Sequence, residues 1–168
     1  MDTPWSFPKQ HIMKNILISF CCFSIIWSAA GQTVQMVQDS QNIQALLDAM
    51  SKAWNIHDAR TYCIAFSEEA DFTNVLGVST YGRDSIEKVH EKSFETIFKN
   101  SSLKITGKKI RYINNDILAV DVSWEMTGVL ASDGKDMPLR KGLANLLLTR
   151  NDKQWLILIM HNMNLPGS

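Results

Sequence analysis

The residues best suited to chemistry in this 168-residue sequence are three histidines. His90 lies among apolar residues with helical spacing, where it can serve as a general acid or base or simply bond a neighbouring backbone group. His161 shares the alternation of Trp155 and Ile157, so we expect all three to point to one side of a strand. His57, His90 and His161 each lack a second ligand at helical spacing, and we therefore predict no metal site.

Motifs for cofactor binding are missing from the sequence. Gly77 and Gly82 stand alone rather than in a phosphate-binding loop, and nothing resembles a flavin or nicotinamide site. We therefore predict no cofactor. Cys63 is best interpreted as a small buried hydrophobic residue rather than a catalytic thiol.

The composition predicts one globular domain. Hydrophobic residues make up 45% of the chain, which is enough for a core. Basic and acidic residues number 17 each, so the chain has no basic surplus to neutralise phosphates. We expect no nucleic-acid partner.

The N-terminal part of the chain has the pattern of an export signal. Residues 16–27 form an uncharged apolar run after Lys14, and Ala30 ends a stretch of small residues suited to cleavage. We predict a signal peptide over residues 1–30, with its true start at Met13, and a periplasmic or secreted protein. The apolar run is too short for a permanent membrane span, although an uncleaved or lipid-linked anchor is an alternative.

Helical patterns dominate the first half of the remaining chain. Apolar residues recur at intervals of three and four over residues 43–54, and Asp39 and Ser40 can cap that helix. A shorter helix follows Asp58, and a third, containing His90, follows Asp84. We therefore divide the exported chain into a short lead over residues 31–39 and one domain over residues 40–168.

Strand patterns alternate with period two. One strand over residues 70–76 precedes the third helix, and four more form a meander over residues 103–113, 117–127, 139–149 and 154–163. Gly107 suits a bulge in a strongly curved sheet. The last two strands are apolar at alternate and intervening positions alike, which favours a homodimer through the outer sheet face.

Residues 53–59 (AWNIHDA) and 70–77 (ADFTNVLG), in this order of elements, resemble the nuclear transport factor 2-like superfamily. The resemblance is sharpened towards SnoaL-like domains of the SgcJ/EcaC group by Gly82-Arg83 with Ile86 and His90, and by Trp155 with His161. It implies an α+β, cone-shaped fold, with three N-terminal helices packed on a curved antiparallel sheet around an apolar pocket. Ketosteroid isomerases, cyclases, dehydratases and non-catalytic binding modules share this fold, so the pocket must decide the function.

The same resemblance argues against steroid isomerisation. Matching the motif of ketosteroid isomerases places their carboxylate base at Asn74 and their oxyanion-stabilising phenol at Met50. An amide cannot accept that proton, and a thioether has no hydrogen to donate.

We therefore expect the domain to bind a small apolar or aromatic molecule. If the domain is an enzyme, His90 and His161 would serve as acid and base in cofactor-independent isomerase, cyclase or lyase chemistry. The alternative is a non-catalytic binding or dimerisation module. The predicted pocket is lined by both histidines together with Trp54, Phe72, Asn74, Tyr81 and Trp124.

The signal-peptide hypothesis predicts two N-termini that sequencing can identify. The precursor should begin at Met13, and the exported protein should begin at Gly31, because cleavage follows Ala30. N-terminal sequencing of both forms tests this. A peptide from residues 1–12 would contradict the start at Met13, and a mature protein that retains residues 16–27 would contradict cleavage.

Overall fold

The structure is a computed structural model that describes residues 34–152 and 154–166. The predicted signal peptide, its start at Met13 and its cleavage site lie outside these residues. The chain divides into two compact units, residues 1–41 and residues 42–168, and each is described by itself. Among the described residues, no helix is long and apolar enough to cross a membrane.

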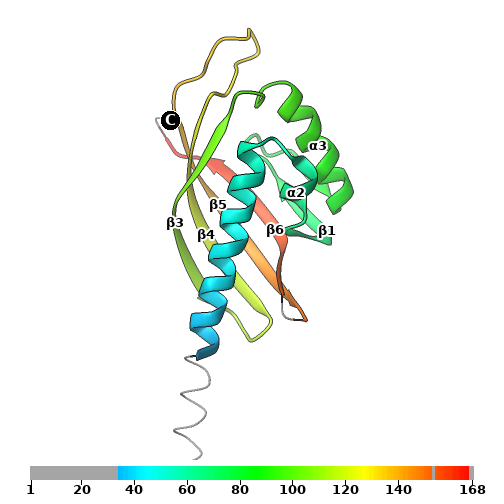
Figure 1. The fold of residues 1–168 in the computed structure, drawn as a ribbon, viewed down its shortest axis with the longest axis vertical. Helices are drawn as coiled ribbons and strands as arrows, with labels where there is room; N and C mark the ends of the chain where they lie inside the picture. The colour runs from blue at the N-terminus through cyan, green and yellow to red at the C-terminus, as the bar shows by residue number, and fades with distance from the viewer. Residues whose placement is uncertain (1–33, 153, 167–168) are drawn as a thin grey trace, which may run out of the picture. The chain divides into compact units, whose positions relative to one another are not determined.

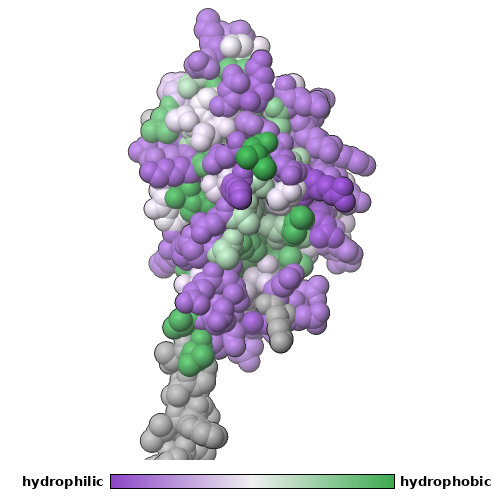
Figure 2. Space-filling model, viewed as in Figure 1, coloured by the Kyte–Doolittle hydropathy of each residue, from purple (hydrophilic) through white to green (hydrophobic). Residues whose placement is uncertain are grey.

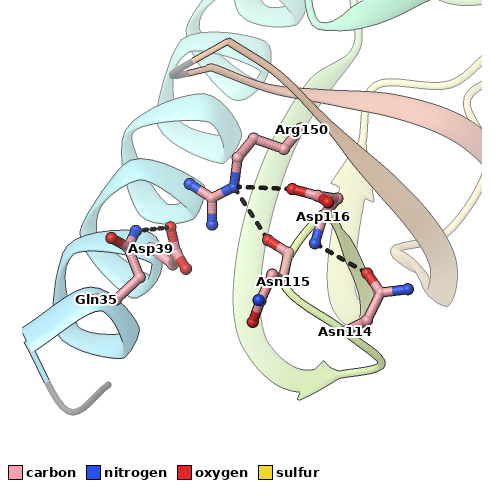
Figure 3. A network of polar contacts seen from close by, with 6 residues as sticks. All are labelled: Gln35, Asp39, Asn114, Asn115, Asp116 and Arg150. Carbon is pink, nitrogen blue, oxygen red and sulfur yellow. Dashed lines mark hydrogen bonds and ion pairs between the residues drawn. The ribbon is translucent and has the colours of Figure 1, made fainter. Parts of the chain in front are cut away.

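Residues 34–41 of the first unit are helical. The expected helix start at Asp39 and Ser40 is therefore wrong, since residues 34–38 of the expected lead are already helical. The Gln35 side chain donates a hydrogen bond of 3.0 Å to the Asp39 carboxylate one turn later (Figure 3). Pairs spaced by four residues support a helix, which explains why Asp39 lies within it.

The helices of the second unit agree with the sequence pattern. Residues 42–55 are helical, and α2 (Ala59–Cys63) and α3 (Arg83–Glu95) follow. Asp58 caps α2 as predicted, because its carboxylate accepts a bond of 2.9 Å from the Thr61 amide. Gly82 rather than Asp84 is the N-cap of α3, so the expected capping box is absent there.

Six strands form one curved sheet with the order β2-β1-β6-β5-β4-β3 (Figure 1). Their bounds are β1 Phe66–Thr73, β2 Ser79–Tyr81, β3 Ser102–Tyr112, β4 Ile117–Thr127, β5 Arg140–Asn151 and β6 Gln154–Asn164. The four C-terminal strands form the predicted antiparallel meander. The expectation of a wholly antiparallel sheet is wrong, because β1 pairs with β6 in parallel. Two strands rather than one precede α3, and β1 begins four residues earlier than predicted.

The register of β1 against β6 shifts between Phe66 and Asp71, and two bulges interrupt the pairing within the meander. In β3 the register shifts between Ile105 and Gly107, which confirms the predicted bulge. In β6 the register shifts because Ile157 pairs with Leu148 and Ile159 with Leu147, which leaves one extra residue between them. Such a bulge reverses which side chains face each side of the strand. The second bulge was not predicted.

The core lies between the helices and the inner face of the sheet. Alternate residues of β4 supply the sheet side, and the apolar stripe of the helix over residues 42–55 lies in the same cluster. Its members include Ile43, Leu47, Trp54, Phe66, Ile86, Leu118, Trp124, Leu148 and Ile157. Figure 2 shows the surface in the view of Figure 1, where hydrophilic residues dominate and hydrophobic ones form small groups.

The two ends of the sheet are held differently. At one end, Arg150 donates a bond of 3.1 Å to the Asn115 carbonyl and lies 4.0 Å from the Asp116 carboxylate (Figure 3). At the other end, the loop after β4 is attached to the end of α3, since the Leu130 amide donates to the Ile97 carbonyl at 2.9 Å. Ile97 and Leu130 both line a cavity.

Candidate functional site

A cavity of about 400 Å³ lies between the helices and the inner face of the sheet. Its walls are mainly apolar, and its charged and polar side chains are few. Besides five of the seven predicted residues, its lining includes Met50, Tyr62, Ser93, Ile97, Val122, Met126, Met137, Arg140, Ala144, Leu146, Met160, Asn162 and Asn164. No aspartate or glutamate of the described residues lines it. A carboxylate base is therefore absent from its wall.

The structure brings together five of the seven predicted site residues. Trp54, Phe72, Asn74, His90 and Trp124 all line the cavity, whereas the other two predicted residues lie elsewhere. The helical period placed Trp54 and His90 correctly, and strand alternation placed Phe72 and Trp124 correctly.

Tyr81 does not line the cavity, and its predicted place there is wrong. It lies on the edge strand β2, is 63% exposed and pairs in register with Asp71 rather than Phe72. Neighbouring residues of a strand point to opposite faces, so Tyr81 shares the outer face with exposed Asp71, and Thr80 shares the inner face with buried Phe72.

His161 also lies outside the cavity, because of the bulge in β6. Trp155 and Ile157 are buried before the bulge, whereas Met160 is buried after it and His161 is exposed. The parity argument from Trp155 was therefore wrong beyond Ile157. On the outer face, His161 pairs in register with Asn145 of β5 and Thr73 of β1.

His90 is 4% exposed and sits inside a cluster of aromatic rings. Its ring centroid lies 4.8 Å from that of Tyr62, 5.0 Å from Phe72 and 6.0 Å from Trp54. Its Nδ1 lies 2.8 Å from the Ile86 carbonyl oxygen. A carbonyl can only accept, so Nδ1 carries the proton and Nε2 carries the lone pair.

Burial lowers the pKa of His90, and the bond to Ile86 opposes this shift only in part. The imidazole is therefore neutral at neutral pH. A neutral imidazole with its Nε2 lone pair can accept a hydrogen bond or a proton from a molecule in the cavity.

Trp124 presents a buried donor with no protein partner. The residue is 7% exposed, and its indole Nε1 has no hydrogen-bond partner among the described residues. Trp124 pairs with Gly142 on β5, and a Cβ atom at Gly142 would come within 1.9 Å of the indole ring. The absent side chain at Gly142 therefore creates the space that the indole occupies.

Tyr62 was not predicted as a site residue, although it lies on the apolar face of α2. Burial raises its pKa well above the usual value, so the phenol stays protonated. It lines the cavity next to His90 and can donate a hydrogen bond there.

Two predicted residues already have structural hydrogen bonds. The Trp54 indole donates to the Ser101 hydroxyl at 3.0 Å, which ties the first helix to the start of β3. The Asn74 side-chain oxygen accepts from the amides of Leu76 and Val78 at 2.9 and 3.0 Å, which closes the turn between β1 and β2. Both residues therefore shape the cavity.

Arg140, Asn162 and Asn164 were also missed as site residues. Asn162 and Asn164 face the cavity only because the bulge in β6 reverses the alternation. Arg140 stands at the start of β5, where alternation gives little information, and its guanidinium donates to the Asn164 side-chain oxygen at 2.8 Å.

The described residues contain no cluster of side chains that could hold a metal ion. Cys63 is fully buried, and burial raises the pKa of its thiol to about 12. Its predicted place in the core is therefore confirmed, and its thiol stays protonated rather than forming the reactive thiolate.

The lowered pKa of His90 predicts a specific loss of stability in acid. As the pH falls below the ordinary histidine value of 6.5, the unfolded chain binds a proton that the folded chain rejects. Urea unfolding should therefore give a free energy that falls by up to about 1.4 kcal/mol per pH unit between pH 6.5 and pH 5. His90→Gln should remove this part of the slope.

His161→Gln is the matched control, because His161 is exposed on the outer face. This variant should keep the slope of the unsubstituted protein. Equal slopes for the unsubstituted protein and His90→Gln would show that His90 does not resist protonation.

Known proteins resemble this chain in their fold. No model of a protein family matches the chain, and no curated protein matches its sequence. A Caulobacter vibrioides protein with a cystatin-like fold is 26% identical, with a TM-score of 0.70 over 76% of this chain and 90% of that one. An NTF-2-like protein of Shewanella oneidensis is 22% identical, with a TM-score of 0.63 over 74% and 98%.

A provisionally named scytalone dehydratase of Novosphingobium aromaticivorans is 16% identical, with a TM-score of 0.69 over 79% of this chain and 88% of that one. The helices, the strand order and these likenesses agree with one another. The chain therefore has the cystatin-like fold of nuclear transport factor 2-like proteins.

Proposed function

We propose that this chain is an exported SnoaL-like domain of the SgcJ/EcaC group that binds a small, mainly apolar molecule in its cavity. The volume of about 400 Å³ supports this, because small-molecule sites commonly measure roughly 300 to 1,000 Å³. Mainly apolar walls with few polar groups are also typical of such sites.

The unpaired Nε1–H of Trp124 is the observation that carries the proposal. A buried donor without a partner costs about 1 to 3 kcal/mol, and an oxygen atom of a bound molecule would remove that cost. The ligand we expect is therefore an apolar body with at least one oxygen acceptor. If this region were only packed core, the unpaired Trp124 donor would lower the stability of the fold without any compensating interaction.

Any catalysis at this site would be proton transfer by His90. Its Nε2 lone pair would accept the proton, and the neighbouring Tyr62 hydroxyl would stabilise developing negative charge on oxygen. Since His161 lies outside the cavity, the expected pair of histidines is reduced to one. Proton transfer of this kind needs no cofactor in isomerase, cyclase or lyase chemistry. Among these three classes, the likeness to a provisionally named dehydratase supports a lyase.

Binding of naphthalene-2-carboxamide tests the cavity, because this probe combines an apolar ring with a neutral carbonyl oxygen. Ala144 lies on the inner face of β5 between Val122 and Asn162, so Ala144→Phe would place a ring inside the cavity. Calorimetry should show binding to the unsubstituted protein and an affinity about tenfold or more weaker for Ala144→Phe.

Thr106→Phe is the control, because it adds the same ring at an exposed position of the edge strand β3. This variant should bind the probe normally. Binding by a folded Ala144→Phe variant at the original affinity, or no binding by the unsubstituted protein, would contradict the proposal. Circular dichroism establishes that each variant is folded.

An apolar strip on the outer sheet face favours association of two copies as a second candidate function. Leu143, Leu147 and Ile159 lie there only partly buried, and Met163 is exposed beside Leu143. Partly exposed apolar side chains on one sheet face are suited to a symmetric homodimer.

Light scattering should therefore give twice the mass of one chain. Leu147→Glu should produce a monomer, because it places a charge within the apolar strip. Lys104→Glu, on the exposed edge strand β3, should remain dimeric. A monomeric unsubstituted protein would exclude this candidate.

A further inference from the structure

The wall of the cavity carries formal charge of one sign only. Arg140 is its one permanently charged side chain among the described residues, since no aspartate or glutamate lines the cavity and His90 is neutral. A cavity with apolar walls and a single cation fits a molecule of the opposite charge.

Arg140 differs from the arginines that stabilise the rest of the fold. Arg83 lies 3.2 Å from the Glu68 carboxylate, and Arg111 and Arg150 also lie beside carboxylates. Arg140 has no carboxylate partner among the described residues, and its guanidinium donates only to the neutral amide oxygen of Asn164. A guanidinium has five donors, so most of them remain available.

The environment of Arg140 makes this unpaired charge costly. The residue is partly buried, and removal from water lowers the pKa of its guanidinium. An anionic group bound beside Arg140 would compensate for the lost hydration. A guanidinium matches a carboxylate especially well, because its planar fork can donate two parallel hydrogen bonds.

The register of β5 relates Arg140 to the buried donor. Arg140 and Gly142 lie two residues apart and share the inner face, and the Trp124 ring lies over Gly142. Trp124 and Arg140 are thus diagonal neighbours, with backbone positions about 7 to 8 Å apart. Asn164, which bonds Arg140, and Met137 also line the cavity, and both are exposed, so Arg140 lies in a part of the lining that solvent reaches.

We propose that the ligand is an amphipathic organic acid, whose carboxylate pairs with Arg140 while its apolar body extends inward past Trp124 towards His90. This inference rests on the proposed function, because it identifies the chemical class of the molecule that occupies the same cavity. An amine of the same shape is disfavoured, since it would meet the guanidinium and no carboxylate.

Two probes of the same shape separate charge from shape. 2-Naphthoate carries a carboxylate where naphthalene-2-carboxamide carries a neutral amide. Calorimetry on the unsubstituted protein should give about tenfold or tighter binding of the acid. Arg140→Gln should abolish that preference, while the carboxamide should still bind. The carboxamide therefore also reports whether the variant retains a folded cavity.

Arg111→Gln is the matched control, because it removes the same charge from β3, outside the cavity lining. It should keep the preference for the acid. Equal binding of both probes to the unsubstituted protein, or a preference that survives in Arg140→Gln, would overturn this inference and leave the proposed function standing. Failure of both probes to bind would instead contradict the proposed function.

Discussion

Packing of aromatic rings around His90 is the interaction on which the rest of the second unit depends. Trp54 comes from the first helix, Tyr62 from α2, Phe72 from β1, and Phe94 from α3 itself, and their rings lie within about 6 Å of the imidazole. This cluster fixes three helices and one strand at a single place. The remaining inner face of the sheet extends beyond the cluster, and the cavity occupies that uncovered part.

The position of His90 would let one residue serve both the structure and the proposed chemistry. One ring nitrogen is bound to the backbone of its own helix, which holds the imidazole in a fixed orientation. The same burial that keeps the ring neutral also makes it a poor acceptor of protons from bulk water. A bound molecule would exclude water from this site. The proton accepted by His90 Nε2 would then come from that molecule rather than from water.

The sequence was a good guide to regular elements, but of the two bulges in the meander it indicated only the one at Gly107. Helix stripes placed Trp54 and His90 correctly, and strand alternation placed Phe72 and Trp124 on the inner face. His161 was misplaced because one inserted residue in β6 reverses the alternation, and nothing in a run of apolar residues indicates where the insertion falls. The parallel pairing of β1 with β6 is likewise set by long-range packing, which local patterns do not encode.

The glycine at position 142 has a consequence that reaches beyond the space it leaves for an indole. A glycine within a strand normally weakens it, yet here the absent side chain leaves room for the Trp124 ring against the neighbouring strand. The indole donor is thereby held at a fixed depth, and its separation from Arg140 is set by strand register rather than by flexible loops. The fixed separation of the Trp124 donor and Arg140 would therefore let the proposed site distinguish molecules by the distance between their oxygen atoms as well as by their size.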